Sequence, residues 1–213
     1  MERDLAVRAG LGWVGKNTCV IHPQKGSLFF LGEIFTTLAA PPAPAMVPDM
    51  CGTCDRCIQA CPTQAIQAPR ILDAGKCISY WTIEARAPAP VELREKFGDW
   101  FFGCDICQTV CPWNEKVFGR EPMRALSQAT LPQAEALVQD LRAVLSATPG
   151  ELRARFERLP YSRARALGLK RNALYIAGNL RLKELSADVQ VHLTNPDLGS
   201  IAEWALARIA EQP

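Results

Sequence analysis

The cysteines of this chain are spaced as ligands of iron–sulfur clusters. Eight of the nine fall into two groups of four. The first group forms the run C-x2-C-x2-C-x3-C-P, with Cys51, Cys54, Cys57 and Cys61. The second run, which ends before Pro112, has the same spacing without its first cysteine and contains Cys104, Cys107 and Cys111. Cys77 lies between the two runs and is the candidate for the missing ligand.

The spacing also predicts how the cysteines are shared between two clusters. In two-cluster ferredoxin folds, the cysteine before proline ligates the other cluster. This rule predicts one [4Fe–4S] cluster on Cys51, Cys54, Cys57 and Cys111. It predicts the second cluster on Cys61, Cys77, Cys104 and Cys107, and the chain would therefore carry electrons. Cys19 could replace Cys77, although a lone cysteine in an apolar stretch is more often a small buried hydrophobe.

Two other uses of cysteine fit the pattern less well. Structural zinc also takes C-x2-C pairs, but it needs only four ligands and has no reason to prefer a three-cysteine run that ends in Cys-Pro. A disulfide framework is expected in secreted chains, and nothing resembling a secretory signal opens this one. We therefore expect a cytoplasmic protein with reduced thiols.

Composition adds one further candidate site. The 213 residues carry a net charge of +2, and no apolar run is long enough to cross a bilayer, so we expect no membrane association. Between Glu151 and Arg171, however, seven basic residues face only two acidic ones. The basic residues are Arg153, Arg155, Arg158, Arg163, Arg165, Lys170 and Arg171. This excess predicts a phosphate-binding patch, or equally an ordinary solvated helical face.

Three regions must position these residues. Residues 1–9 predict a helix that ends at Gly10, followed by a glycine loop and a hairpin with strands Thr18–His22 and Leu28–Thr37 around a turn at residues 23–26. A Pro/Ala-rich linker at residues 39–45 is expected to be extended. The cluster region follows. After residue 119, apolar spacing at residues 137–145, 174–180 and 201–209 predicts amphipathic helices, arranged as stacked pairs of the HEAT type.

Beyond the cluster motif, several segments resemble the epoxyqueuosine reductases. The stretch A-G-L-G-W-V-G-K-N-T at residues 9–18 is similar to a glycine-rich segment of that family. Further matching segments are Leu31–Ile34, Cys77–Glu84, Gly103–Gln108, Cys111–Asn114 and Leu169–Ala173. The resemblance covers essentially the whole chain.

The resemblance implies a tRNA-modifying oxidoreductase that reduces epoxyqueuosine to queuosine at the wobble position. Its cofactors would be two [4Fe–4S] clusters and cobalamin. The implied fold class is α+β, with a bacterial ferredoxin-like two-[4Fe–4S] domain at residues 46–118. The remnant of a cobalamin-binding α/β domain would precede it at residues 1–45, and a HEAT-like helical tRNA-binding domain would follow at residues 119–213.

The resemblance also implies roles for individual residues. Those expected to bind cobalamin are Trp13, Gly15, Lys16, Asn17, Ser79 and Asp105. Those expected to contact tRNA are Glu84, Arg163, Arg165, Lys170 and Arg171. A flipped base could stack on Tyr80 or Trp81, although each is as readily explained by packing around a cluster.

One part of the family pattern is not present in this sequence. The family's proton-donating aspartate belongs to a segment expected upstream of Met1, so we expect the chain to be a C-terminal portion and assign no catalytic residue. Asp4 has the wrong sequence context for that role. The expected partners are the tRNA anticodon loop and a low-potential donor such as a flavodoxin or ferredoxin, with the chain a monomer.

Two other functions remain open from the sequence. A reductive dehalogenase would share the logic of clusters and a corrin, but it would not need a basic helical appendage. A ferredoxin-type electron carrier would leave the cysteine-free C-terminal region unexplained. Binding of tRNA separates the first reading from both of these.

Overall fold

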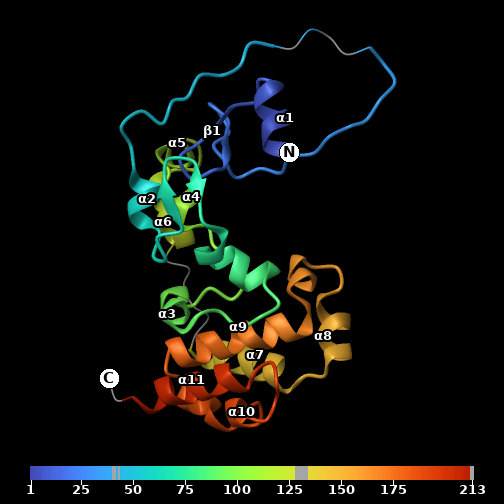
Figure 1. Cartoon of the computed structure of the whole chain (residues 1–213), viewed down its shortest axis with the longest axis vertical. Helices are drawn as coiled ribbons and strands as arrows, with labels where there is room; N and C mark the ends of the chain where they lie inside the picture. The colour runs from blue at the N-terminus through green and yellow to red at the C-terminus, as the bar shows by residue number, and fades with distance from the viewer. Residues whose placement is uncertain (40–41, 43, 128–133, 212–213) are drawn as a thin grey trace. The chain divides into compact units, whose positions relative to one another are not determined.

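The structure is a computed structural model that describes residues 1–39, 42, 44–127 and 134–211. It is rich in helix and has few strands (Figure 1). The chain divides into two compact units. The first unit contains Met1–Asp73 and Asp105–Ala129, and the second contains Ala74–Cys104 and Thr130–Pro213.

The first unit combines short helices with two small sheets. Its helices are α1 (Glu2–Arg8), α2 (Arg56–Ala60), α4 (Ile106–Thr109), α5 (Pro112–Phe118) and α6 (Arg120–Ser127). Its strands are β1 (Trp13–Val14), β2 (Val20–Ile21), β3 (Ile66–Ala68) and β4 (Ile71–Leu72). Each sheet is a single antiparallel pair, β1 with β2 and β3 with β4.

The predicted N-terminal helix is confirmed, but the predicted hairpin is wrong. β2 pairs with β1, in the register Trp13 to Ile21, and not with residues 28–37. The turn does form, because His22 and Gly26 make an isolated bridge. The segment after it has no strand, and Ile34 and Phe35 are each 93% exposed. Apolar residues alone do not make a strand, because its backbone groups need a neighbour to pair with.

The second unit is helical. Its helices are α3 (Val91–Arg94), α7 (Ala134–Ser146), α8 (Pro149–Phe156), α9 (Arg165–Asn179), α10 (Ser186–Gln190) and α11 (Gly199–Ala210). Its short helical turns are η1 (Ala74–Lys76), the π-helical η2 (Tyr80–Glu84), η3 (Glu95–Phe97), η4 (Pro160–Ala164) and η5 (Lys183–Leu185).

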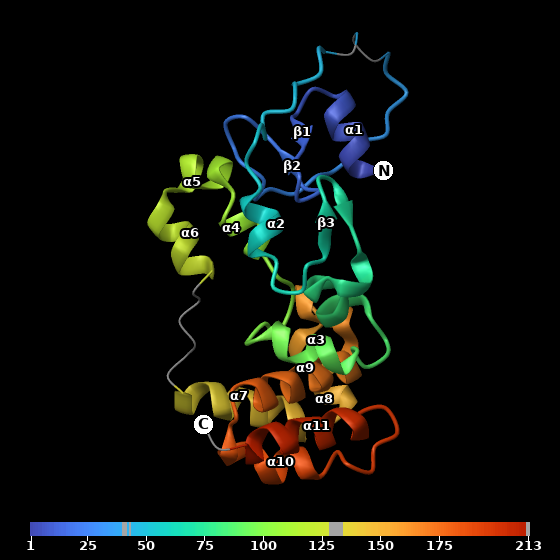
Figure 2. The ribbon, with the colours of Figure 1, turned by 60° about the vertical axis from the view of Figure 1, so that its left-hand side comes forward.

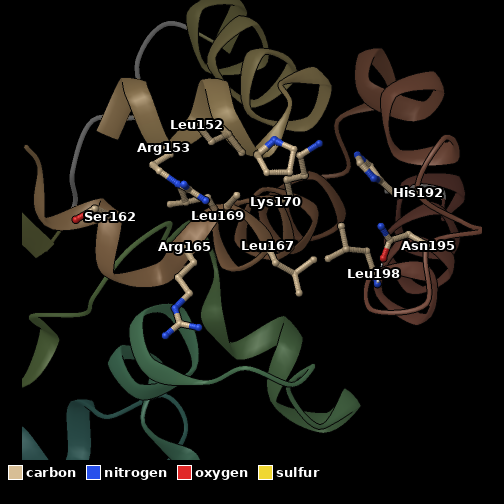
Figure 3. Close-up of a pocket in the computed structure, with 12 residues that line it drawn as sticks. Leu152, Arg153, Ser162, Arg165, Leu167, Leu169, Lys170, His192, Asn195 and Leu198 are labelled. Carbon is tan, nitrogen blue, oxygen red and sulfur yellow. Dashed lines mark hydrogen bonds between the residues drawn. The ribbon is translucent and has the colours of Figure 1, made fainter. Parts of the chain in front are cut away.

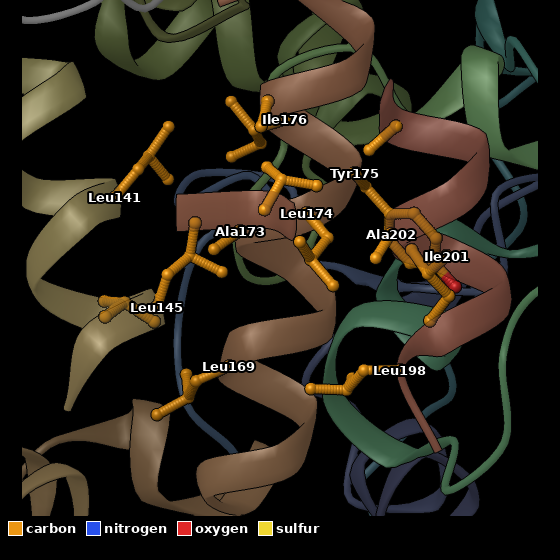
Figure 4. Packing of buried hydrophobic residues seen from close by; sticks show 14 of the residues in the cluster. Leu141, Leu145, Leu169, Ala173, Leu174, Tyr175, Ile176, Leu198, Ile201 and Ala202 are labelled. Carbon is orange, nitrogen blue, oxygen red and sulfur yellow. The ribbon is translucent and has the colours of Figure 1, made fainter. Parts of the chain in front are cut away.

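The core of the second unit is centred on α9. Figure 2 shows α7, α9 and α11 side by side, and the buried leucines, isoleucines and alanines of these helices interdigitate (Figure 4). Ala173, Leu174 and Ala177 of α9 are entirely buried. The three helices predicted from apolar spacing are therefore confirmed. A threonine–glutamate capping box, Thr148 with Glu151, starts α8 between them.

The larger organisation agrees with the prediction only in its coarse features. The helix-rich composition with few strands is as expected, whereas the HEAT-type stacking and the boundaries at residues 45 and 118 stay predictions. The predicted cluster region at residues 46–118 contributes to both compact units. Residues 40, 41 and 43 of the predicted extended linker lie outside the described residues. Among the described residues, none of the helices has the length and apolarity that crossing a membrane requires.

Candidate iron–sulfur centre

Four cysteine thiols line one cavity of the first unit. The cavity has a volume of about 150 Å³, and its cysteines are Cys51, Cys54, Cys57 and Cys111. This is the set predicted for the first cluster, so the structure brings the fourth ligand to the other three from 54 residues further along the chain than Cys57. The lining comes from three segments that are far apart in sequence. Besides the cysteines it includes Lys16 and Asn17 from the first segment, Met50 from the second and Trp113 from the third.

Local backbone structure explains how the four cysteines are placed. Cys51 and Cys54 belong to a tight turn in which the Cys54 amide donates to the Cys51 carbonyl at 3.1 Å. Cys57 lies in α2, and Cys111 precedes α5 in extended conformation. Pro112 occupies the first turn of α5, where a missing N–H costs nothing. The Cys-Pro signature is thus the start of a helix that directs Cys111 back toward the first run.

The electrostatics of the cavity suit a polynuclear metal group. Burial, together with the nearby Cys111, Cys51 and Cys54, raises the pKa of the Cys57 thiol to about 11. Burial likewise raises the pKa of Cys111. Four thiolates this close repel one another unless cations lie between them. The donors surround a space, and four sulfurs around a space are the donor set of a cubane cluster.

The glycine loop supports this cavity directly. Trp13 is 3% exposed and donates its indole N–H to the Cys51 sulfur at 3.4 Å. Its ring also meets Trp113 edge to face, with centroids 4.9 Å apart. Lys16 Nζ donates to the carbonyls of Gly52 and Cys54, both at 2.7 Å. A cation and an N–H donor next to cluster sulfurs are the features that tune reduction potentials.

Asn17 and Gly15 fix the shape of that loop. Asn17 is buried, donates to the Cys107 carbonyl at 3.1 Å and accepts from the Cys19 amide at 3.2 Å. A side chain at Gly15 would collide with Ile21 at 2.5 Å and with the Asn17 amide oxygen at 2.8 Å. Contacts with Ile21 and Asn17 are therefore sufficient to require a glycine at position 15. Contact of Trp13, Gly15, Lys16 or Asn17 with a corrin stays a prediction.

A buried asparagine that the sequence reasoning overlooked joins the turn at residues 22–26 to the cluster loop. Asn114 has no exposed surface; its amide oxygen accepts from the Ser27 amide at 2.6 Å, and its nitrogen donates to the Gln108 carbonyl at 2.8 Å. Gly26 has a positive φ of 69°, and a Cβ there would lie 2.1 Å from the Asn114 oxygen. The spacing Cys-Pro-Trp-Asn was the available signal, since the asparagine follows Cys111 by three residues.

The cysteines predicted for the second cluster are divided between the two units. Cys61 and Cys107 belong to the first unit, and Cys77 and Cys104 to the second. The Cys61 sulfur accepts from the Ala65 amide at 3.2 Å. Cys19 lies beside Cys107. A hydrogen bond between the two side chains lowers the pKa of the Cys19 thiol. The ligand set of this cluster, with Cys77 or with Cys19, stays a prediction.

Ser79 and Asp105 sit beside two of these cysteines. Ser79 Oγ donates to the Cys104 carbonyl at 3.3 Å, within the second unit. Asp105 precedes α4 in the first unit and accepts from the Gln108 side chain at 2.7 Å. Both have roles in local structure. Their predicted contact with a corrin stays a prediction.

The prediction that Arg171 contacts tRNA is wrong, because the Arg171 side chain is buried. Arg171 is 3% exposed, and its guanidinium donates to the backbone carbonyls of Trp81 and, at 2.7 Å, Ala85. The neighbouring Asn172 is fully buried and donates to the Thr82 and Phe101 carbonyls at 2.7 and 2.8 Å. Together they donate to the carbonyls of Trp81 and Thr82 within η2 and of Ala85 just after it, where a short helix leaves carbonyls without intrahelical partners.

The hydrogen bonds of Arg171 and Asn172 give the segment K-R-N at residues 170–172 a structural role. It attaches α9 both to the turn that follows Cys77 and to the segment that leads into Cys104. The sequence suggested a cationic surface because Arg171 ends a basic run. Helical geometry turns Arg171 and Asn172 inward, so only the fold distinguishes these two from the exposed arginines before them.

The other residues predicted to contact tRNA lie on the surface of the second unit. Glu84 and Arg163 form an ion pair at 2.7 Å. Arg165 is exposed, and Lys170 is half-buried with its ammonium donating to the Leu145 carbonyl at 2.7 Å. Tyr80 and Trp81 meet edge to face, and the Trp81 indole donates to the Gly75 carbonyl at 2.7 Å. Base stacking on either ring stays a prediction.

Comparison with known proteins agrees with the cysteine chemistry. Residues 50–114 match the 4Fe-4S double cluster binding domain. The chain is 39% identical to the epoxyqueuosine reductase of Pseudomonas aeruginosa over 99% of its own length and 58% of that protein. It is 52% identical to the epoxyqueuosine reductase of Xanthomonas campestris over 62% of this chain and 39% of that one.

Solved structures give the same result. The epoxyqueuosine reductase of Streptococcus thermophilus aligns with a TM-score of 0.83 and 29% identity, covering 100% of this chain and 55% of that one. An epoxyqueuosine reductase solved with an epoxyqueuosine-modified tRNA-Tyr stem loop aligns with a TM-score of 0.79 and 28% identity, over 99% of this chain and 55% of that one. The chain thus spans little more than half the length of these relatives. Over that length, it is a homologue of the C-terminal portion of the epoxyqueuosine reductases.

Proposed function

We propose that this chain is the cluster-bearing and tRNA-binding portion of an epoxyqueuosine reductase, an oxidoreductase of queuosine synthesis. The observation that carries the proposal is the cavity lined by Cys51, Cys54, Cys57 and Cys111 in a chain homologous to those enzymes. The homology favours this function over a dehalogenase or a simple electron carrier.

The reaction sets the requirements for the whole enzyme. Reducing an epoxide to an alkene consumes two electrons and protonates the oxygen that leaves. When bound, the two [4Fe–4S] clusters would supply single electrons, and cobalamin the two-electron chemistry at carbon. Cobalamin enters through family resemblance, with residues 1–45 as part of its domain and Trp13, Gly15, Lys16, Asn17, Ser79 and Asp105 nearest to it.

The residues of this chain would hold and insulate the first cluster. Trp113 lines the cavity, and Trp13 packs against the Trp113 ring and donates its indole N–H to the Cys51 sulfur, so both rings would shield a bound cluster from water. Lys16 places a positive charge beside the loop of Cys51 and Cys54, which favours the reduced, more negative state of a bound cluster. The proton for the departing oxygen is not assigned to a residue of this chain.

The tRNA part of the proposal rests on the surface of the second unit. One relative was solved with an epoxyqueuosine-modified tRNA stem loop. In this chain, Glu84, Arg163, Arg165 and Lys170 are available for such a contact, and Arg171 is not. Residues 119–213 would form the HEAT-like tRNA-binding domain of a cytoplasmic, monomeric enzyme, reduced by a flavodoxin or ferredoxin.

Anaerobic reconstitution tests the proposal. The chain is loaded with iron, sulfide and cobalamin, desalted, and assayed for iron and corrin per chain. We expect eight irons in the wild type and about four in Cys111→Ser, because a cubane that loses a ligand is retained poorly. An epoxyqueuosine-modified stem loop is then added with a chemical reductant, and queuosine is measured by mass spectrometry. Stoichiometric zinc in place of iron would refute the proposal.

A further inference from the structure

Arg70 is an ordered arginine of the first unit that has no role in the proposed function. The open groove of the second unit, with a volume of about 720 Å³, belongs to the surface already proposed for tRNA, because Arg165 and Lys170 line it (Figure 3). Arg70 lies in the other compact unit, in the turn between β3 and β4, and its side chain is 39% exposed. Its contacts distinguish a solvated side chain from one with a purpose.

Arg70 binds the glycine loop at two points. Its backbone amide donates to the Lys16 carbonyl at 3.0 Å, and its guanidinium Nε donates to the Val14 carbonyl at 2.9 Å. These two carbonyls lie on either side of Gly15. A guanidinium presents its donors in a rigid planar fork, so the contact holds the loop in one orientation.

The same guanidinium also reaches the segment that leads into the first cysteine run. A terminal nitrogen of Arg70 donates to one carboxylate oxygen of Asp49, and the other oxygen accepts from the Cys51 amide at 2.9 Å. An exposed ion pair of this kind adds little to folding stability. Its effect is geometric, because one side chain fixes both the glycine loop and the start of the turn that carries Cys51.

The glycine loop in turn contacts the ligands of the first cluster. Trp13 donates its indole N–H to the Cys51 sulfur, and Lys16 Nζ donates to two carbonyls of the same turn. Arg70 is not part of the described lining of the cavity, so it acts on a bound cluster through the residues that it holds. Hydrogen bonds to sulfur and nearby charges are the features that set the reduction potential of a cluster.

The backbone of Arg70 adds an independent observation. Its φ of 66° lies in the left-handed region, which favours glycine, and Pro69 precedes it. A proline followed by a residue of positive φ is the pattern of a type II turn, whose third position is usually glycine. An arginine there is strained, and such strain collects at functional sites. The guanidinium contacts are what glycine at this position would lack.

We propose that Arg70 is a positioning residue for the first cluster, which holds Trp13 and Lys16 against the turn that begins at Cys51 and thereby sets the reduction potential of the cluster. The inference rests on the proposed function and deepens it, because it assigns control of the potential to a residue outside the cavity. Loss of the guanidinium would free the glycine loop, weaken the N–H bond to sulfur and leave the Asp49 carboxylate without its counter-charge. Each of these changes disfavours the reduced, more negative cluster.

A redox titration of the iron-loaded chain, followed by electron paramagnetic resonance, tests this. In Arg70→Gln, the ratio of reduced to oxidised first cluster at a fixed potential should fall about tenfold, as when an outer partner of a metal ligand is removed. For one electron, this is a shift of the midpoint by about 59 mV to more negative potential. Trp13→Phe removes the N–H from the Cys51 sulfur and so identifies the midpoint of the first cluster. Arg8→Gln removes the same charge from an exposed site of the same unit and should titrate as the wild type does.

Two further variants separate positioning from folding and from charge. Arg70→Gly removes the guanidinium and relieves the backbone, so the midpoint should shift as in Arg70→Gln while the melting temperature stays close to that of the wild type. Arg70→Lys keeps the charge but cannot reproduce the planar fork, and its midpoint should shift as well. A wild-type midpoint in Arg70→Gly would reduce Arg70 to a turn residue and overturn the proposal. Full rescue by Arg70→Lys would show an effect of charge alone and would overturn the positioning role.

The double variant Trp13→Phe/Arg70→Gln tests the route of the effect. If Arg70 acts through the loop that carries Trp13, the two shifts overlap, and the combined shift is smaller than their sum. Strictly additive shifts would show that the two residues act independently and would overturn the proposed route. A wild-type chain that takes up zinc and no iron would overturn the proposed function together with this inference. With eight irons loaded, an unchanged midpoint in Arg70→Gln overturns this inference alone, and the proposed function stands.

Discussion

At the scale of single residues, the site depends on buried amides more than on the cysteines alone. Asn17 and Asn114 are buried and connect backbone groups that lie 80 to 90 residues apart in sequence. Each places a cysteine-bearing loop by satisfying its backbone N–H or C=O. A thiol can move with its loop, so the position of each loop decides whether four sulfurs can share one cluster.

Removing the Asn114 amide should therefore loosen the first cluster. Asn114→Ala leaves the Ser27 amide and the Gln108 carbonyl without partners, and we expect a loss of about 1–3 kcal/mol in the free energy of unfolding. Iron retained after dialysis against a chelator should fall toward four per chain. Gln24→Ala, which removes an exposed amide in the same unit, is the control. Full iron retention in Asn114→Ala would contradict this role.

His192 should make the second unit sensitive to mild acid. It is 7% exposed, its ring contacts the Leu145 carbonyl, and burial and the nearby Lys170 ammonium lower its pKa. The unfolded chain then binds a proton more readily than the folded chain below about pH 6.5, so stability is complete above that pH and falls as the pH decreases. Chemical denaturation of wild type and His192→Gln between pH 7.5 and 5.5, followed by helical circular dichroism, measures it. Parallel losses in both proteins would show that another group is responsible.

At the scale of elements, α9 connects the helical region to the Cys77 segment. Arg171 and Asn172 hold the end of η2 and the segment before Cys104, and Gly103 donates to Thr82 at 3.0 Å in the same network. π-Helical turns such as η2 are rare and often occur at functional sites. We attribute the persistence of this one to the side chains that satisfy its carbonyls.

Asn172→Ala should therefore affect one cluster and spare the other. Two buried carbonyls lose their donor, and we expect the free energy of unfolding to drop by about 2–4 kcal/mol. About four irons should remain, because the four cysteines of the first cluster lie in the other compact unit. Iron counting and electron paramagnetic resonance of the reduced protein measure this. Gln190→Ala removes an exposed amide of the second unit as the control, and retention of eight irons in Asn172→Ala would exclude the role.

At the scale of the whole molecule, the predicted second cluster draws two cysteines from each compact unit. Loading this predicted cluster should therefore make the unfolding of the two units interdependent. We expect the apo chain to unfold in two thermal transitions and the loaded chain in one, whereas Cys77→Ser keeps two transitions and about four irons. Differential scanning calorimetry under anaerobic conditions measures this. Full iron loading in Cys77→Ser, with loss in Cys19→Ser, would instead make Cys19 the ligand.

Much of the site was predictable because its chemistry is local in sequence. Closely spaced cysteines and the Cys-Pro ending identify the clusters, and the pairing rule predicted that Cys111 would join Cys51, Cys54 and Cys57. The amphipathic helices were also predictable, since a period near 3.6 residues is visible in any window. The hairpin was not predictable, because the tertiary fold decides which segment a strand pairs with, and β2 pairs with β1 and not with residues 28–37.

The sequence by itself determined the cluster-binding pattern of cysteines and the family resemblance of this protein, because cysteine spacing and short motifs are properties of adjacent residues. Only the tertiary structure decided which basic residues face solvent and which are buried and hydrogen-bonded inside the protein. Arg165 and Arg171 stand six positions apart in one basic run, yet the first lines an open groove and the second saturates buried carbonyls. Burial depends on what packs against a helix, and charge alone does not encode it.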